Sequence, residues 1–230
     1  MLQACLNGRR TVAEHRLVPR TPEELAADAG AVAAAGAEAL HVHPRGADGA
    51  ETMEVEAAVR AIRGAVRLPI SVTTGAWIGG DRVEAVRSWT VVPDEASVNL
   101  SEEGWGDLAE ALLGRGVALE AGVWTADDAE RLVAGGLLDR CRRLLLEPGD
   151  RDPEAALTTV AAIEAVLGTR GPPRLVHGKG ATAWPLLREA QRRGLDTRIG
   201  LEDVLVLPDG TPAPGNAALV AAAAAPMVGT

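Results

Sequence analysis

The chain has few cysteines, few basic residues, and no phenylalanine or tyrosine. Its 230 residues include only two cysteines, Cys5 and Cys141, which lie far apart in the sequence. Two such residues provide neither a disulfide framework nor a zinc knuckle, so we expect a reducing, cytoplasmic compartment. Lysine and arginine number 23 against 32 aspartates and glutamates, and the net charge is −9. Nucleic acid and anionic membranes require a basic face, so neither is expected as a partner. The missing aromatic residues exclude no function by themselves.

Long hydrophobic runs and nucleotide-binding motifs are also absent. The opening MLQACLNGRR has too short an apolar run for a signal peptide, and its positive charge follows that run. The segment AALVAAAAAPMV is too short to cross a bilayer. No G-x-G-x-x-G follows the first apolar run, and no G-x-x-x-x-G-K-[ST] occurs anywhere. We therefore expect neither a leader nor a membrane span, and the usual markers of a nucleotide-binding fold are missing.

Short apolar runs alternate with helix-like segments along the whole chain. The runs predict strands at 2–8, 39–44, 68–75, 96–101, 117–124, 141–148, 173–180 and 197–203. Helices are predicted at 21–37, 53–66, 81–89, 105–115, 126–137, 152–167, 182–194 and 216–225. Alternation of this kind indicates a parallel sheet. Eight such units predict an α/β fold, a (β/α)8 TIM barrel formed by residues 1–230 as a single domain. An open doubly wound sheet is the alternative.

Polar and ionisable residues stand at the ends of almost all the predicted strands. They are Asn7, His41, His43, Thr73, Thr74, Asn99, Ser101, Glu120, Glu147, His177, Lys179, Arg198, Glu202 and Asp203. A TIM barrel places its active site at the C-terminal ends of its strands. Buried charges need partners or a ligand, so this ring favours an enzyme over a barrel whose strands only pack.

The H-x-H pattern of the second strand is the clearest candidate for a metal site. Residues two apart in a strand share a face, so His41 and His43 are expected to project together. Two imidazoles suit a transition metal such as Zn²⁺, although paired histidines in a strand are often only packed residues. Glu202, at the end of the last strand, is the best candidate for a third ligand. Two histidines and one carboxylate would leave an open position for water or substrate.

The segment TRIGLED offers further catalytic candidates. Arg198 suits a clamp for a carboxylate because its planar guanidinium binds in a bidentate manner. Asp203 is either a general base or an ordinary helix cap or ion-pair partner of Arg198. Glu120, within an apolar strand, requires a partner such as Arg198, a lysine or the substrate. Near Gly178, the segment VHGKGATAW fits either an anion cradle or a simple glycine turn.

Several motifs, in order along nearly the whole chain, resemble those of the β-keto acid cleavage enzymes. They are ACLNG, PRTPEELAADA, ALHVHPR, SVTTGAW, ASVNLSE, EAGVW and RIGLED. The resemblance implies a zinc-dependent TIM barrel that converts a β-keto acid and acetyl-CoA into acetoacetate and a new acyl-CoA. The family also tends to form homodimers or homotetramers.

The resemblance also implies roles for individual residues. His41, His43 and Glu202 would hold Zn²⁺, and Asp203, supported by Arg198, would remove a proton from the α-carbon. Thr73 or Thr74 matches the family's hydroxyl after the third strand, and Glu120 matches a carboxylate that contacts a substrate amino group in some members. The residues expected to bind substrate are Asn7, Arg45, Asn99, His177 and Gly178.

The chain departs from the family pattern after its first strand. Arg9 and Arg10 replace an acidic residue there, which indicates a more anionic substrate than one carrying an amino group. Two other functions are alternatives to acyl exchange with acetyl-CoA. One is a metal-dependent hydrolase or aldolase-type lyase acting on a small keto acid without CoA, and the other is a non-catalytic barrel that binds a metal or ligand.

Overall fold

The computed structural model describes residues 1–226, so residues 227–230 of the predicted domain lie outside the description. Its strands are parallel and follow one another around the sheet in chain order, with β8 beside β1. They are β1 (Leu2–Cys5), β2 (Ala39–Val42), β3 (Ile70–Thr73), β4 (Glu95–Asn99), β5 (Ala118–Val123), β6 (Cys141–Leu146), β7 (Arg174–Val176) and β8 (Thr197–Ile199). This order confirms the TIM barrel and excludes the doubly wound alternative.

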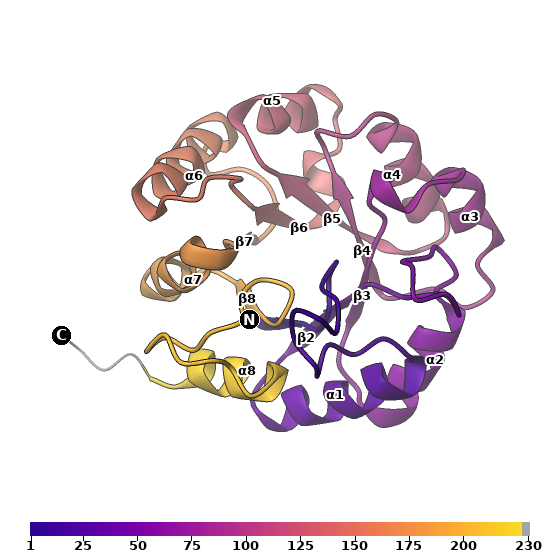
Figure 1. The fold of residues 1–230 in the computed structure, drawn as a ribbon. Helices are drawn as coiled ribbons and strands as arrows, with labels where there is room; N and C mark the ends of the chain where they lie inside the picture. The colour runs from indigo at the N-terminus through magenta and orange to yellow at the C-terminus, as the bar shows by residue number, and fades with distance from the viewer. Residues whose placement is uncertain (227–230) are drawn as a thin grey trace.

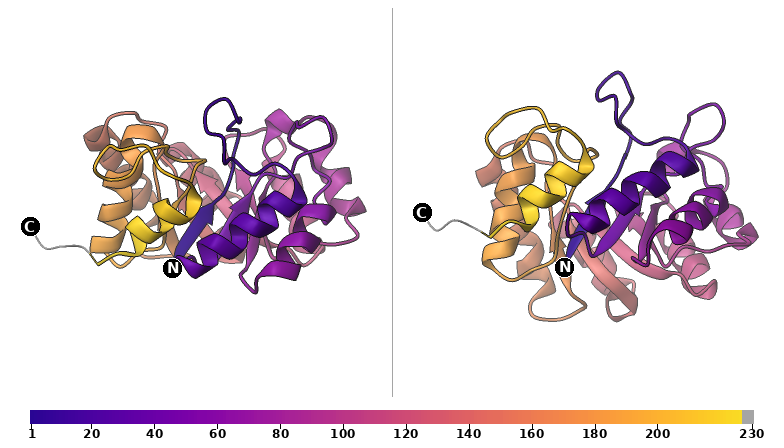
Figure 2. Two further views of the ribbon diagram at one scale, coloured as in Figure 1. Left: turned by 60° about the horizontal axis from the view of Figure 1, so that its bottom comes forward. Right: turned by 90° about the horizontal axis from the view of Figure 1, so that it is seen from below.

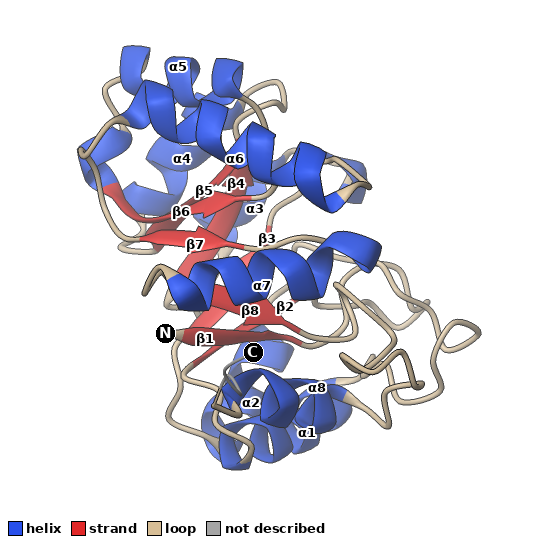
Figure 3. Ribbon diagram, turned by 90° about the vertical axis from the view of Figure 1, so that its left-hand side faces the viewer, coloured by secondary structure: helices blue, strands red, loops and turns tan. Residues whose placement is uncertain are grey.

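Among the described residues, eight α-helices surround the strands as an outer ring (Figures 1 and 3). They are α1 (Pro22–Ala34), α2 (Glu56–Ala65), α3 (Arg82–Ser88), α4 (Trp105–Gly114), α5 (Ala126–Ala134), α6 (Pro153–Leu167), α7 (Ala183–Arg192) and α8 (Asn216–Ala224). Helix α1 begins as its sequence predicts, with Thr21 and Glu24 forming a capping box around Pro22. Within residues 1–226, none of the helices has the length and apolar character needed to traverse a bilayer.

The barrel is nearly closed, and its seam lies between β7 and β8. These strands are joined by a parallel bridge between Leu175 and Asp196, the residue that precedes β8. The Val176 amide donates to the Asp196 carbonyl at 3.0 Å, and the Thr197 hydroxyl donates to the Val176 carbonyl at 2.9 Å. The loops after β1 and β8 project from the opposite end of the barrel to the N-terminus (Figure 2). This is the C-terminal end of the strands, where barrels carry their active sites.

A buried ionic cluster fills the middle of the barrel. Glu120 is fully buried, and its Oε1 accepts from Arg143 Nη1 at 2.6 Å and from Gln3 Nε2 at 3.2 Å. The Ser71 hydroxyl donates to the other oxygen of Glu120. Arg143 also donates to Glu95 at 3.1 Å. The partner that Glu120 requires is therefore Arg143, rather than Arg198, a lysine or a substrate.

Asn216, the first residue of α8, connects three segments near the mouth of the barrel. Its Nδ2 donates to the Leu6 carbonyl at 2.7 Å and to the Asp28 carboxylate at 2.6 Å. Its Oδ1 accepts from the Leu201 amide at 2.7 Å. The side chain is buried, so water cannot replace these bonds easily. Asn216 therefore fixes the end of β1 relative to the turn after β8.

We expect Asn216→Ala to lower the free energy of unfolding by about 2–3 kcal/mol, because it leaves buried backbone groups without partners. Urea denaturation followed by circular dichroism measures the change. Gln191→Ala is the matched control, since Gln191 is half-buried and the single acceptor of its Nε2 among residues 1–226 is Ala223 O. We expect about 1 kcal/mol or less for the control. Equal losses in the two variants would contradict the role given to Asn216.

Candidate functional site

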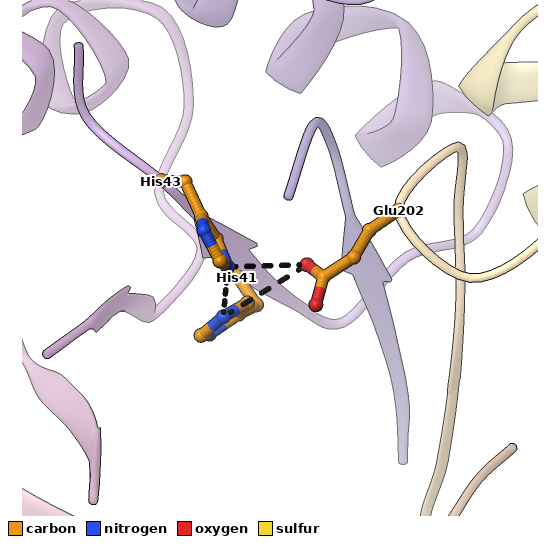
Figure 4. A group of neighbouring side chains, drawn as sticks. All are labelled: His41, His43 and Glu202. Atoms are coloured by element: carbon orange, nitrogen blue, oxygen red, sulfur yellow. Dashed lines mark hydrogen bonds and ion pairs between the residues drawn. The ribbon is translucent and has the colours of Figure 1, made fainter. Parts of the chain in front are cut away.

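His41, His43 and Glu202 converge at the C-terminal end of the barrel (Figure 4). His41 lies in β2, and His43 follows the last residue of that strand. The two Nε2 atoms are 3.3 Å apart. Glu202 Oε2 lies 3.5 Å from His43 Nε2 and 3.9 Å from His41 Nε2. All three side chains are less than a tenth exposed.

Glu202 reaches this place from a turn and not from a regular strand. Strand β8 ends at Ile199, and the amides of Asp203 and Val204 both donate to the Gly200 carbonyl at 2.9 and 3.0 Å. The predicted strand at 197–203 is therefore too long. Gly200 has no side chain, which allows the turn to approach β1: a Cβ there would lie 1.9 Å from the Cys5 carbonyl oxygen.

The hydrogen bonds around the two imidazoles determine which nitrogen carries the proton. Ser71 gives its only hydroxyl proton to Glu120, so its oxygen, 3.2 Å from His41 Nδ1, must accept from that nitrogen. His43 Nδ1 lies 3.1 Å from Glu51 Oε2, and a carboxylate can only accept. In the neutral form of each imidazole, Nε2 is then the unprotonated nitrogen. Between two neutral rings with these tautomers, the contact of the Nε2 atoms is not a hydrogen bond.

Three lone-pair donors thus face one another without a proton between them. Glu202 Oε2 is buried and has no hydrogen-bond partner within residues 1–226. A tetrahedral zinc site with bonds of about 2.0–2.1 Å separates its ligand atoms by about 3.3 Å. The measured separations of 3.3, 3.5 and 3.9 Å fall close to that value. The donor set therefore fits a metal ion such as Zn²⁺, with room for an exchangeable ligand.

The ionisation of His41 and Glu202 suits the same role. Burial lowers the pKa of His41 to about 3, so its imidazole is neutral. Burial alone would raise the pKa of Glu202, but Arg198 and the histidines outweigh it and lower that pKa. A neutral imidazole and an ionised carboxylate are the forms that bind a metal.

Glu51 and Trp77 hold His43 in place. Glu51 Oε2 accepts from Trp77 Nε1 at 2.6 Å as well as from His43. The indole ring is nearly parallel to the imidazole, with an interplanar angle of 18° and 6.3 Å between centroids. A carboxylate on the outer nitrogen of a metal-binding histidine fixes its orientation and makes it a stronger ligand. Neither Glu51 nor Trp77 is among the residues predicted for the site, because both lie in loops without a regular spacing from the H-x-H motif.

Arg198 connects the candidate metal site to the residues behind it. Its Nη2 donates to Glu202 Oε1 at 2.8 Å and to Asp203 Oδ1 at 2.9 Å. Its Nε donates to His177 Nδ1 at 3.1 Å. The ion pair of Arg198 and Asp203, one of the two interpretations of Asp203, is therefore present. Asp203 Oδ2 is buried without a hydrogen-bond partner among the described residues. Burial raises the pKa of Asp203, and Arg198 only partly offsets this effect.

A cavity of about 280 Å³ opens above the three candidate ligands. The predicted residues that line it are Thr73, Asn99, Arg198, His41, His43 and Glu202. Asn99 Nδ2 also donates to Glu102 at 2.8 Å. Arg9, Arg10, Trp77, Glu147 and Lys179 complete much of the wall. The volume suits a small acid, and most of a CoA molecule would have to remain outside it.

Other predicted substrate-binding residues instead hold the backbone around the site. Asn7 Nδ2 donates to the His43 carbonyl at 2.8 Å, and its Oδ1 accepts from the His43 amide at 2.9 Å. Arg45 Nη2 donates to the carbonyls of Gly8 at 2.8 Å and Arg10 at 2.7 Å. Neither side chain lines the cavity. Their place in the family motif is explained here by support of the H-x-H segment and of the loop after β1.

Five further predicted residues do not line the cavity either, and one of them is Asp203, which is fully buried and bonded to Arg198. Thr74 points away and donates to the Ser97 carbonyl at 2.6 Å, so Thr73 supplies the hydroxyl at this position. Gly178 forms a tight turn, in which a Cβ would lie 2.4 Å from Thr182 Oγ1. His177 is buried behind Arg198, with Nε2 at 3.2 Å from Glu147 Oε2. Glu120 lies deeper, in the ionic cluster, and touches the site only through Ser71.

Comparison with solved structures supports the fold. ObcA, in its apo form, superposes with a TM-score of 0.65 at 17% identity, over 89% of this chain and 60% of that one. The chain thus spans less than two thirds of the length of ObcA. The 3-dehydroquinate dehydratase of Geobacillus kaustophilus HTA426 gives a TM-score of 0.61 at 15% identity, covering 96% of this chain and 89% of the other. At these identities the likeness shows the barrel fold alone.

The family is shown by the sequence itself. The family model for the beta-keto acid cleavage enzyme matches residues 1–228, which is nearly the whole chain. The matched range contains the H-x-H segment, the turn after β8 that carries Glu202, and all the residues that line the cavity. The chain therefore belongs to the β-keto acid cleavage enzyme family.

Proposed function

We propose that the protein is a zinc-dependent enzyme that exchanges acyl groups between a β-keto acid and acetyl-CoA. The products would be acetoacetate and a new acyl-CoA. The observation that carries the proposal is the convergence of three lone-pair donors in a small cavity beside Arg198 and Asp203. Family membership supports carbon–carbon cleavage or acyl transfer as the reaction type.

The substrate would bind with its carboxylate on Arg198. Two nitrogens of this guanidinium already donate to the protein, but Nη1 makes no hydrogen bond to residues 1–226. Arg198 lines the cavity, so Nη1 is available to an acid inside it. Zinc held by His41, His43 and Glu202 would supply Lewis-acid polarisation of the β-keto carbonyl. Thr73 and Asn99 would contact the bound acid from the neighbouring strands β3 and β4.

Asp203 would act as the general base. Its unpartnered Oδ2 would take a proton from the α-carbon, and its raised pKa makes it a stronger base than a solvent-exposed aspartate. The carbanion would attack the thioester carbon of acetyl-CoA and expel the CoA thiolate. The thiolate would then attack the original keto carbon, and the bond between that carbon and the α-carbon would break. Asp203 would return its proton to the leaving carbanion, which gives acetoacetate.

The experiment that tests the reaction incubates the zinc-loaded protein with a β-keto acid, with and without acetyl-CoA. We expect acetoacetate and the new acyl-CoA to form together, and only when acetyl-CoA is present. Mass spectrometry of both products measures this outcome. Cleavage that proceeds at the same rate without acetyl-CoA would favour the hydrolase or aldolase-type alternative. Zinc binding without any turnover would favour the non-catalytic barrel.

We expect Asp203→Asn to reduce turnover by about 10²–10⁴-fold while zinc remains bound, because the change removes the base and not a metal ligand. Steady-state kinetics and metal analysis of the same sample check both parts. Asp209→Asn is the matched control, since Asp209 accepts from Thr211 in an exposed loop. Near-normal turnover in Asp203→Asn would remove Asp203 from the mechanism.

We expect Glu51→Gln to weaken zinc binding by about 10–100-fold, because His43 would lose the carboxylate that orients it. His41→Ala, which removes a ligand, should weaken binding further. Competition with a zinc chelator measures the affinities, with Glu54→Gln as an exposed control nearby in the same loop. If Glu51→Gln and His41→Ala both bind zinc as tightly as the control and the wild type do, the metal lies elsewhere.

A further inference from the structure

The charges that line the cavity are paired, with one exception. Three cations of the wall each lie close to a carboxylate of the same wall: Arg10 to Glu14 at 2.7 Å, Lys179 to Glu147 at 2.7 Å, and Arg198 to Glu202 at 2.8 Å. Arg9 also lines the cavity, but it forms no ion pair or side-chain hydrogen bond within the described part of the chain. The cavity therefore carries one uncompensated positive charge, at its exposed edge.

The backbone that carries Arg9 is held rigidly. A single nitrogen of Arg45, Nη2, binds the carbonyls on both sides of Arg9, those of Gly8 and Arg10. Gly8 has a φ of +53°, and a Cβ at this position would lie 2.3 Å from Glu202 Cγ. Gly8 thus packs directly against a candidate metal ligand. The position of Arg9 relative to the metal site is consequently set by the fold.

The side chain of Arg9 is also placed. Its guanidinium carbon lies 5.4 Å from the centroid of the Trp77 ring, a cation–π contact. The same indole also stacks on His43. One aromatic ring therefore contacts both the unpaired guanidinium and the imidazole of a candidate metal ligand. A short carbon chain could extend from the metal site past the edge of this ring to Arg9.

We propose that Arg9 binds a second carboxylate at the remote end of the substrate, so that the preferred substrate is a β-keto dicarboxylic acid. This inference rests on the proposed function, because it assumes that the other end of the acid binds at Arg198 beside the metal. A guanidinium already oriented by a rigid backbone and an aromatic ring loses little freedom when it binds a carboxylate. A substrate with a remote amino group would be repelled from the same place.

The test compares two substrates, 3-oxoadipate and 3-oxohexanoate, which differ only in whether the remote end is a carboxylate or a methyl group. For each, kcat/KM is measured with zinc-loaded wild type, Arg9→Met, Arg9→Lys and the control Arg16→Met, an exposed residue of the same loop outside the cavity wall. We expect the wild type to prefer the diacid, and Arg9→Met to reduce that preference about tenfold or more, mainly through KM. Arg9→Lys should retain part of the preference, and Arg16→Met all of it.

A binding measurement separates the failure of this inference from failure of the proposed reaction. Calorimetric titration with adipate and hexanoate, neither of which can react, should show that adipate binds the wild type about tenfold more tightly than it binds Arg9→Met. If adipate binding depends on Arg9 but no keto acid is turned over, the carboxylate site stands and the reaction fails. If 3-oxohexanoate is turned over but Arg9→Met leaves the preference and adipate binding unchanged, the reaction stands and the inference is overturned.

Discussion

The site depends on three acceptor atoms that have no proton to share. Ser71 and Glu51 each accept the Nδ1 proton of one histidine. In the neutral rings this leaves the lone pair of both Nε2 atoms free to bind a metal. Glu202 Oε2, at 3.5 Å from His43 Nε2, is the third atom with a free lone pair. Such an arrangement in a buried place is unfavourable without a cation. The fold must therefore hold the three side chains together against their mutual repulsion.

Several features of the barrel provide this constraint. Asn7 binds both backbone groups of His43, and Asn216 ties the end of β1 to the turn that carries Glu202. The ionic cluster of Glu120 and Arg143 extends the support below His41 through Ser71. The residues that look catalytic in the sequence thus divide into two groups. Some face the cavity, and others position those that do.

Much of this arrangement is predictable from sequence. The period of strands and helices predicts the barrel, and the two-residue spacing of His41 and His43 predicts that they share a face. Glu202 follows from the rule that strand ends meet, although the last strand is shorter than predicted and ends in a turn. The prediction of Glu202 as a candidate ligand depends on which strand ends lie together in the barrel, and not on the exact residue at which β8 ends.

The remainder depends on contacts between residues distant in sequence. Whether Asn7 or Arg45 faces substrate or backbone is decided by loop geometry, which has no periodic signal. Glu120 is recognisable in the sequence as a buried carboxylate, but its partner Arg143 belongs to the next strand, β6. The pairing of β5 with β6 shifts register between Leu119 and Glu120, so strand spacing alone does not predict this contact. Glu51 and Trp77 meet His43 only because two separate loops fold over the same strand end.

The most direct test of the account is anomalous diffraction at the zinc absorption edge from crystals of the zinc-loaded protein. We expect one strong peak in the barrel mouth, within bonding distance of Nε2 of both histidines and of Glu202 Oε2, about 2.0–2.2 Å from each. A peak at any other set of residues, or no peak in protein shown to contain zinc, would contradict it.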